Sequence, residues 1–180
     1  MFTTRFAPSP TGYLHRGHAF SALTAFEAAR AANGRFLLRI EDIDTARCRP
    51  DYEAAIYEDL AWLGLEWEQP VRRQSEHLAD YQAALDRLHE RGLLYRCFKT
   101  RKELAEIQSA PHGLPDVFRS RAMHPHEEDR YLEEGRAYAW RLSLDAARAA
   151  LPNWSGLSFV DEARGTVRAQ PDLAGDVVLA

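Results

Sequence analysis

Two histidines three residues apart, His15 and His18, are the residues of this chain best suited to phosphate chemistry. They follow a loop-forming run, residues 5–14 (Arg-Phe-Ala-Pro-Ser-Pro-Thr-Gly-Tyr-Leu), and precede a helical pattern. Ring N–H groups at a helix start can stabilise charge on a transferred phosphate without a covalent nucleophile. The same pair is also compatible with a surface cap or with half of a metal site.

Glycines in this run would let the backbone approach a ligand closely. Gly12 and Gly17 lack the Cβ that would otherwise stand in the way. The chain has neither the Gly-x-Gly-x-x-Gly fingerprint of dinucleotide-binding folds nor a Walker loop. Phosphate binding here would therefore depend on a helix N-terminus and on the two histidines.

A short acidic segment, Glu41-Asp42-Ile43-Asp44, follows an apolar run that is typical of a strand. The ends of parallel strands meet at one edge of a sheet, so these carboxylates are expected to face the same crevice as the first loop. Arg5 supplies the opposite charge on the other wall. A carboxylate and a guanidinium flanking one pocket would suit an amino acid with an extra carboxylate. Structural ion pairs or solvated turn charges are the other explanation of this spacing.

The elements that would position these groups form a strand–helix–strand unit. Residues 2–6 predict a short strand that prolines end, and apolar residues recur at helical spacing from His18 to about Asn33. Residues 35–40 form a near-continuous apolar run, typical of a strand buried on both faces. The length of this unit suits a parallel crossover.

Further along, the patterns predict more helices and strands. One helix runs from Pro50 to Gly64, and another, capped by Ser75, ends at Gly92. Thr100 has capping-box spacing to Glu103. The remaining expected elements are strands at 71–74, 93–98 and 137–142, a hairpin over 157–161 and 166–169, and a final strand over 175–180.

These elements predict an α/β fold: a Rossmann-like parallel sheet with helices on both faces, plus an irregular α+β insertion. The insertion begins near Ser109, where the sequence becomes rich in proline and histidine and shows no clear helix or strand periodicity. We therefore expect a nucleotide-binding half over 1–108, and an insertion and hairpin over 109–180. The final strand has no partner visible in the sequence, so the C-terminal part of the fold is expected to be missing.

Composition is that of a soluble globular protein from a reducing compartment. The chain has 180 residues, 46% hydrophobic and 28% charged, with a formal net charge of −4 and two cysteines. It has no signal pattern and no apolar run of membrane-spanning length, so we expect a cytoplasmic protein. The negative net charge of the whole chain gives no reason to expect RNA binding. Local candidates for an RNA contact are Arg47, Arg49, Arg72 and Arg73.

Two motifs make the chain resemble a known family. Residues 5–18, which end in His-Arg-Gly-His, and residues 38–44 (Leu-Arg-Ile-Glu-Asp-Ile-Asp) look like the catalytic domain of glutamyl-tRNA synthetases. These are class I aminoacyl-tRNA synthetases with a His-Ile-Gly-His signature. Weaker similarity continues to residues 175–179 (Gly-Asp-Val-Val-Leu). The resemblance implies a ligase that activates an amino acid with ATP and passes it to tRNA.

Details of the motifs resemble the glutamyl-Q-tRNA(Asp) synthetases, a truncated branch of this family. Ile43, and the Ala-Phe-Ser-Ala that follows His18, favour this branch. It implies ATP-dependent activation of glutamate and its transfer to the queuosine base of tRNA(Asp). Two alternatives stay open: a discriminating glutamyl-tRNA synthetase that charges the acceptor end, and a non-catalytic synthetase-like module that binds tRNA or a protein.

The resemblance also implies roles for residues at matching positions. Arg5 would meet the side-chain carboxylate of glutamate, and Glu41 would meet its α-ammonium group. His15 and His18 would be the catalytic pair that stabilises the phosphates of ATP. The glutamate pocket would be lined by Arg5, Ala7, Ser9 and Glu41. The ATP site would be lined by Pro8, Thr11, Gly12, His15, Gly17 and His18.

The resemblance implies ATP with Mg²⁺ as cofactor, but no zinc. Relatives often build a zinc site from Cys-x-Cys, then Tyr and Cys; here only Cys97 remains, with Phe118 and Ala122 at the later positions. Other candidate ligands lack metal-binding spacing: His112, His124 and His126. The family's lysine-rich loop is absent, so that half of the adenylation site is expected beyond Ala180. Expected partners are glutamate, ATP and tRNA, with no membrane and the protein a monomer.

Overall fold

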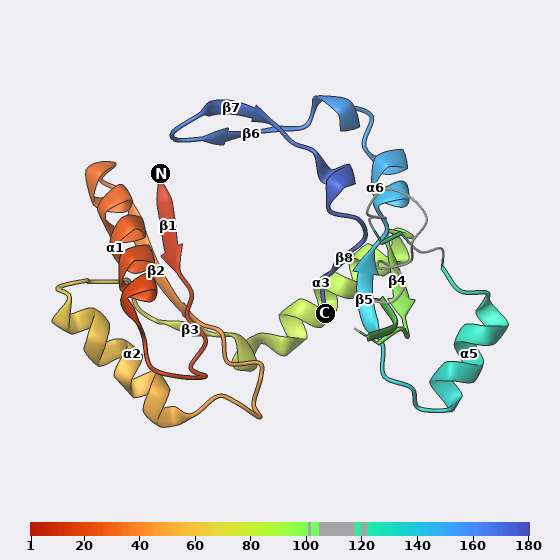
Figure 1. Cartoon of the computed structure of the whole chain (residues 1–180), viewed down its shortest axis with the longest axis horizontal. Coiled ribbons are helices and arrows are strands. Elements are labelled where there is room, and N and C mark those ends of the chain that lie inside the picture. Colours follow the sequence, from red (N-terminus) through yellow and green to blue (C-terminus); the bar gives the residue numbers. More distant parts are fainter. Residues whose placement is uncertain (101, 105–117, 120–121) are drawn as a thin grey trace. The chain divides into compact units, whose positions relative to one another are not determined.

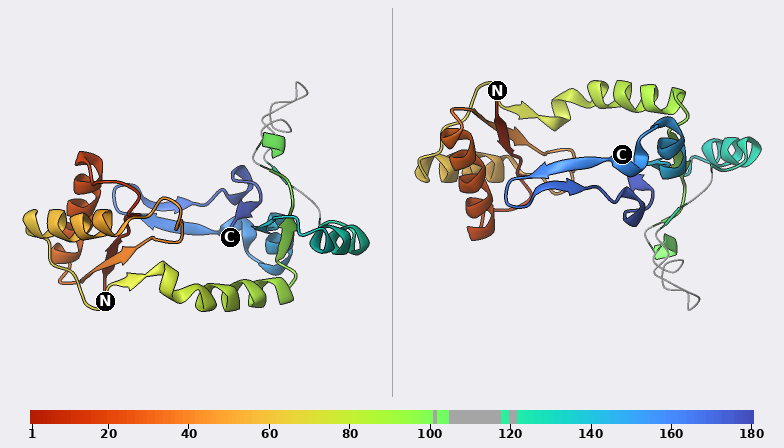
Figure 2. Two further views of the ribbon diagram at one scale, coloured as in Figure 1. Left: turned by 90° about the horizontal axis from the view of Figure 1, so that it is seen from below. Right: turned by 90° about the horizontal axis from the view of Figure 1, so that it is seen from above.

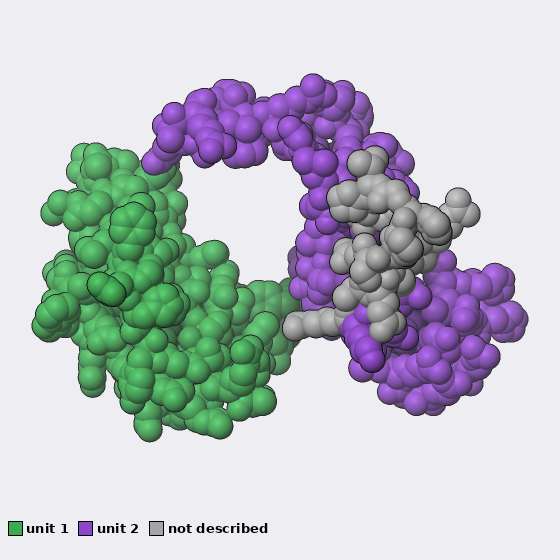
Figure 3. Space-filling view, viewed as in Figure 1, with its two compact units in different colours: residues 1–81 green, residues 82–180 purple. Residues whose placement is uncertain are grey.

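The computed structural model describes residues 1–100, 102–104, 118–119 and 122–180. They form two compact units, Met1–Tyr81 and Gln82–Ala180, which are drawn in Figures 1 and 2 and coloured separately in Figure 3. The functional division expected at residue 108 stays a prediction, because residues 105–117 lie outside the described part of the chain.

The first unit is built on a parallel three-stranded sheet of order β1-β2-β3 (Figure 1). Thr3 pairs with Arg35, and Arg39 pairs with Arg72. The parallel α/β architecture expected from the sequence is confirmed. In chain order the elements are β1 (Thr3–Phe6), α1 (Arg16–Ala31), β2 (Arg35–Ile40), α2 (Pro50–Trp62), β3 (Arg72–Arg73) and the 3-10 turn η1 (Gln74–His77).

One face of β2 carries the core of this unit. Phe36, Leu38 and Ile40 are buried, whereas Leu37 and Arg39 between them are only half-buried. The prediction that this strand is buried on both faces is wrong, because its side chains alternate between a buried and a partly open face. The buried cluster also contains Phe6, Ala22, Ala29, Ile56, Leu60 and Leu65.

Both helices of the first unit contribute to this cluster because the strand order advances in one direction. Right-handed crossovers then place α1 and α2 on the same side of the sheet. Phe26 of α1 lies edge-on to Phe36, with ring centroids 5.5 Å apart. The hydroxyl of Thr4 donates to the carbonyl of Ala25 over 2.7 Å. A helix on the opposite face would require a crossover in the other direction, to a strand on the far side of β1.

Glycines end two of the helices as the sequence predicts. Gly64 follows α2 with φ 74°, and Gly92 follows α3 (Leu78–Glu90) with φ 69°. Both angles lie in the left-handed region, where a residue without Cβ is favoured. These two turns direct the chain from each helix into the next extended segment.

The second unit contains an antiparallel sheet of order β4-β5-β8. The final strand therefore does have a partner: Val178 of β8 lies opposite Arg141 of β5. The sequence could not show this pairing because 35 residues or more separate the two strands. The elements are β4 (Leu94–Cys97), α5 (Pro125–Glu133), β5 (Ala139–Leu142), α6 (Leu144–Ala150), η2 (Trp154–Gly156), η3 (Pro171–Leu173) and β8 (Val177–Val178).

A buried carboxylate connects the last strand to the rest of this unit. Asp176 accepts the hydroxyl proton of Tyr95 over 2.8 Å and the backbone N–H of Leu144 over 2.9 Å. Arg141 donates to the carbonyl of Asp176 over 2.7 Å. Burial, together with the neighbouring Asp176, raises the pKa of Tyr95. The neutral phenol is therefore the form that holds β8 in place.

Two local predictions are confirmed in this unit. The hairpin pairs β6 (Ser158–Asp161) with β7 (Gly165–Arg168) and forms the blue ribbon in Figure 2. In the capping box, the N–H of Thr100 donates to Glu103 Oε2 over 2.7 Å, and the N–H of Glu103 donates to Thr100 Oγ1 over 3.3 Å. Both features depend on contacts close in sequence.

The buried face of α2 can be tested with two substitutions on the same helix. Leu60 is fully buried, whereas Trp62 is 85% exposed. We predict that Leu60→Ala lowers the free energy of unfolding by about 2–5 kcal/mol, because it leaves a cavity. The matched control, Trp62→Ala, removes a larger side chain and should cost less than about 0.5 kcal/mol. Urea unfolding followed by circular dichroism measures both, and equal losses would contradict this core.

Candidate functional site

A cavity of about 460 Å³ opens where β1 ends and α1 begins. This is the edge of a parallel sheet at which ligands bind, because backbone N–H groups and a helix N-terminus converge there. Most of the residues predicted from the sequence line it: Arg5, Ala7, Pro8, Ser9, Thr11, Gly12 and His18. Three lining residues were not predicted, since nothing in their spacing distinguishes them: Phe6, Tyr13 and Ser21.

Arg5 is the cation of this cavity. Its side chain is exposed, and within the described part of the chain no acidic residue forms an ion pair with it. By contrast, Arg39 on the neighbouring strand pairs with Glu41. A free guanidinium can donate two parallel hydrogen bonds to a carboxylate. The cavity is therefore equipped to bind an anion at this wall.

The two histidines cap the start of α1 and also cap each other. His15 is the N-cap residue, and its Nδ1 accepts the backbone N–H of Gly17 over 3.1 Å. The Nδ1 of His18 accepts the backbone N–H of His15 over 3.3 Å. The rings stack with centroids 3.8 Å apart and 23° between their planes. The cap and phosphate interpretations of this pair are therefore compatible, because capping uses only one nitrogen of each ring.

This capping selects one tautomer of each ring. A nitrogen that accepts a hydrogen bond carries no proton, so a neutral ring must hold its proton on Nε2. Burial and the neighbouring His15 both lower the pKa of His18, which favours its neutral form. Two Nε2–H donors are thus held side by side at the positive end of a helix.

Gly17 makes room for the ring of His15. A Cβ at this position would lie 3.0 Å from His15 Cε1 and 3.2 Å from its Nδ1. Any other residue would therefore crowd the ring against the backbone that it caps. A Cβ at Gly12 would meet nothing within 4 Å, so that glycine leaves open space at the cavity wall.

The end of β2 lies beside the first loop, as the strand–helix–strand prediction requires. The backbone N–H of Glu41 donates to the carbonyl of Pro8 over 2.9 Å. The Glu41 carboxylate, however, pairs with Arg39 and is not part of the cavity lining. A ligand that uses this carboxylate would have to share it with Arg39 or displace that side chain.

The prediction that the acidic segment faces one crevice is wrong for its two aspartates. Asp42 is buried and accepts both the backbone N–H of Ser75, over 2.9 Å, and its hydroxyl, over 2.5 Å. Asp44 pairs with Arg47 over 2.6 Å. The alternative explanation, structural ion pairs and turn charges, is the right one for both aspartates.

Ser75 was expected to cap the third helix, but it has a different partner. It lies within η1, and both its N–H and its hydroxyl donate to Asp42. Arg73 also approaches Asp42, at 3.3 Å. The sequence could not reveal this connection, because Asp42 is 33 residues away along the chain. It fastens the end of β2 to the segment after β3.

The arginines proposed for RNA contact all have partners in the structure. Arg47 pairs with Asp44, and Arg72 pairs with Asp80 over 2.6 Å. Arg49 donates to two nearby backbone carbonyls. The partners of Arg73 are Asp42, Glu53 and Glu76. An RNA contact by these residues stays a prediction.

The residues considered for zinc do not come together in the described part of the chain. No group of three or more His, Cys, Asp or Glu is placed there to hold a metal ion. Cys97 is buried on β4, and the rings of His124 and His126 stack 6.0 Å apart. His112 lies outside the described residues. A zinc-free protein stays a prediction.

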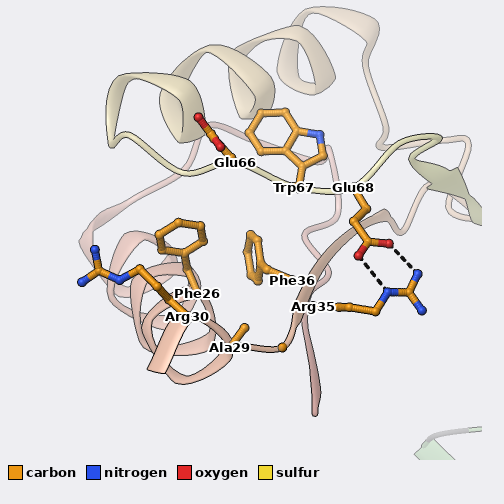
Figure 4. A pocket seen from close by; sticks show the side chains of 9 residues that line it. Phe26, Ala29, Arg30, Arg35, Phe36, Glu66, Trp67 and Glu68 are labelled. Atoms are coloured by element: carbon orange, nitrogen blue, oxygen red, sulfur yellow. Dashed lines mark hydrogen bonds and ion pairs between the residues drawn. The ribbon is translucent and has the colours of Figure 1, made fainter. Parts of the chain in front are cut away.

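A second cavity, of about 370 Å³, lies at the opposite end of β2 (Figure 4). Phe26, Phe36 and Trp67 form its apolar wall. At its rim, Arg35 Nε donates to Glu68 over 2.7 Å. It contains none of the residues predicted for the site, and its two cations, Arg30 and Arg35, are paired with Glu27 and Glu68. The cavity at the carboxyl end of β1 is therefore the candidate site.

Comparison with known proteins identifies the family. The family model for tRNA synthetases class I (E and Q), catalytic domain, matches residues 1–180. The chain belongs to this family. The resemblance found in its two motifs is confirmed.

Curated relatives carry two different names. A glutamyl-Q tRNA(Asp) synthetase from Rhodobacter capsulatus is 58% identical over 113 residues, which cover 62% of this chain and 41% of the relative. A glutamate–tRNA ligase 2 from Methylobacterium sp. (strain 4-46) is 42% identical over 179 residues, which cover 97% of this chain and 38% of the relative. The chain thus spans about two fifths of these relatives' length.

A solved structure shares the fold. The glutamate tRNA ligase from Elizabethkingia meningosepticum, solved in complex with its amino acid, superposes with a TM-score of 0.75 at 30% identity. The match covers 98% of this chain and 38% of that one. Among the described residues of the present structure, no helix has the length and apolar character needed to cross a membrane.

The Asp42 connection predicts a pH-dependent contribution to stability. Burial by itself would raise the pKa of Asp42, but hydrogen bonds from Ser75 and the positive Arg73 outweigh it and hold the pKa below its usual value. The ionised form therefore stabilises the fold above the unfolded-state pKa of about 4, and this stabilisation is lost as pH falls through the lower folded-state pKa.

We expect Asp42→Asn to lower the free energy of unfolding at pH 7 by about 1–3 kcal/mol. The difference from the parent should shrink as the pH is lowered below about 4. Urea titrations across this range measure it. Glu58→Gln, an exposed position on α2, is the matched control and should change little at any pH. A deficit for Asp42→Asn that is independent of pH would contradict the role of its charge.

Proposed function

We propose that this protein activates glutamate with ATP and transfers it to tRNA. The observation that carries the proposal is Arg5, an exposed guanidinium without an acidic partner among the described residues, at the wall of the cavity that adjoins the two capping histidines. A carboxylate on the substrate side chain is the natural partner of such a group. Membership of the E and Q synthetase family supports glutamate as that substrate.

Activation is an in-line displacement at the α-phosphorus of ATP. A carboxylate oxygen of glutamate forms the new P–O bond, the bond to the bridging oxygen of the β-phosphate breaks, and pyrophosphate leaves. Negative charge develops on the phosphate oxygens during this exchange. The Nε2–H groups of His15 and His18 would donate to these oxygens, so the chain contributes orientation and electrostatic stabilisation.

The glutamate pocket is proposed to involve both strands of the crossover. Arg5 would hold the side-chain carboxylate, with Ala7 and Ser9 beside it. Glu41 would accept the α-ammonium group once it exchanges part of its pairing with Arg39. Until the substrate arrives, the pairing with Arg39 holds the carboxylate in one orientation.

The residues present suit ATP more directly than they suit a protein-held metal. Paired ring N–H donors at a helix N-terminus fit phosphate oxygens. Mg²⁺ in nucleotide sites is coordinated largely by phosphates and water. Since the described residues offer no three-ligand group, the metal would enter with the nucleotide. When bound, it would neutralise phosphate charge.

We further propose the queuosine base of tRNA(Asp) as the acceptor. The Rhodobacter capsulatus relative supports this choice by its name, as do Ile43 and the sequence after His18. The hydroxyl of the acceptor would attack the activated carbonyl, and AMP would leave. Charging of the tRNA acceptor end is the second candidate, favoured by relatives such as the Methylobacterium ligase.

Glutamate-dependent exchange of pyrophosphate into ATP tests the proposal. It should be measured on the full chain encoded by the gene, with and without tRNA. Exchange in both conditions supports the queuosine-modifying enzyme, whereas strict dependence on tRNA supports acceptor-end charging. Absence of exchange in both conditions would falsify the enzyme function.

Arg5→Ala tests the carboxylate partner. We expect the KM for glutamate to rise by about 10²-fold, because a charge-assisted bidentate contact is lost. Arg5→Lys should recover only part of the affinity, since an ammonium cannot form the paired bonds. The control is Arg30→Ala, an exposed residue paired with Glu27 on α1. An unchanged KM in Arg5→Ala would exclude this role.

The two functions of His15 can be separated by one substitution. Asparagine is a good N-cap residue but has no distal ring donor. His15→Asn should therefore keep the stability of α1 while the exchange rate falls about 10²-fold. His15→Ala should lose the same rate and also about 1 kcal/mol of stability. If His15→Asn turned over at the parent rate, the phosphate role of His15 would be wrong and capping its only task.

A further inference from the structure

A third cavity, of about 340 Å³, lies within the second unit between β4 and α5. Its wall combines the aromatic rings of Phe98 and Tyr131 with the cations of Lys99 and Arg136. The rings of Phe98 and Tyr131 meet edge-on, with centroids 5.2 Å apart. This volume is within the range of small-molecule sites, and none of its residues belongs to the glutamate or ATP site.

Neighbouring groups hold the planar guanidinium of Arg136 in place at this cavity. Its guanidinium carbon lies 3.8 Å from the centroid of the Tyr131 ring, and its backbone N–H donates to the Tyr131 carbonyl over 3.0 Å. Glu134 contacts its Nε over 2.9 Å. The side chain is exposed, so the face of the guanidinium turned away from the ring can take a second planar group. Nucleobases stack on arginine held in this way.

Lys99 supplies a charge that the described residues leave without an ion-pair partner. Its exposed ammonium at the cavity edge suits a phosphate oxygen. Glu103 and Glu127 add carboxylate oxygens to the lining. A carboxylate repels phosphate but accepts hydrogen bonds from the exocyclic amino group of a base. The rings, cations and carboxylates of this cavity together favour a nucleotide with its base inside the cavity and its phosphate at Lys99.

We propose that this cavity binds a single unpaired nucleotide of the tRNA substrate. The proposal rests on the proposed function for its choice of RNA. Single-stranded RNA is recognised by stacking of splayed bases on aromatic rings and guanidinium planes, with backbone contacts from lysine. A purely acidic peptide would use the cations but would leave the rings and both carboxylates unmatched.

Binding of fluorescently labelled tRNA(Asp) to the full chain tests this site. Arg136→Ala should raise the Kd about tenfold through loss of stacking. Arg136→Lys should not restore the affinity, because an ammonium group has no planar surface on which a base can stack. Lys99→Ala should weaken binding and reduce the slope of log Kd against log salt by about one. Arg91→Ala, an exposed arginine of the same unit, is the control for loss of charge and should bind like the parent.

Exchange without tRNA separates this proposal from the proposed function. The variants should retain the parent rate of glutamate-dependent exchange, because the cavity shares no residue with the first site. Parent-like tRNA binding by Arg136→Ala and Lys99→Ala, with exchange intact, would overturn the nucleotide site alone. Competition by oligocytidine, whose bases carry the exocyclic amino group that the lining carboxylates would accept, supports it. Displacement of tRNA by poly-glutamate but not by oligocytidine would overturn it. Lys99 is exposed and forms no ion pair with a described residue, so Lys99→Ala remains informative if Arg136→Ala fails to fold.

Discussion

The reciprocal cap of His15 and His18 is the interaction on which the candidate site depends. Each ring uses Nδ1 to satisfy a backbone N–H that a helix start would otherwise leave without a partner. The same hydrogen bonds determine where the remaining ring proton lies. The contacts that start the helix therefore also orient the two ring N–H donors, and the missing side chain of Gly17 provides the space for them.

The sheet places this helix start opposite the other charged groups. β1 and β2 pair in parallel, so Arg5 and the end of β2 reach the same edge. The bond from Glu41 N–H to Pro8 then draws the two ends together. Asp42 fastens that edge to the segment after β3 through Ser75 and Arg73. Of the three acidic residues after β2, only Glu41 is left in a position that a substrate exchange could use.

The two units combine different kinds of recognition. The first contains a free guanidinium, paired ring donors and open backbone at a helix N-terminus, which together suit small anions. The second contains edge-on aromatic rings and exposed cations around a separate cavity, which suit a planar base with a phosphate. The proposed transfer of an amino acid to RNA would need both kinds of surface, and the chain as a whole has a net charge of −4, so local groups would have to provide them.

The sequence by itself determined the strand–helix–strand unit, the family and most of the cavity lining, because periodicity, capping and motif spacing are local properties. It also predicted the hairpin and the Thr100 capping box correctly. Only the tertiary structure decided which charges are free: Asp42, Glu41 and Asp44 look alike in sequence but meet Ser75, Arg39 and Arg47. It likewise paired β8 with β5 and left Arg5 without a described acidic partner. Pairing is set by distance in space, and residues far apart along the chain become neighbours only when the strands and helices pack.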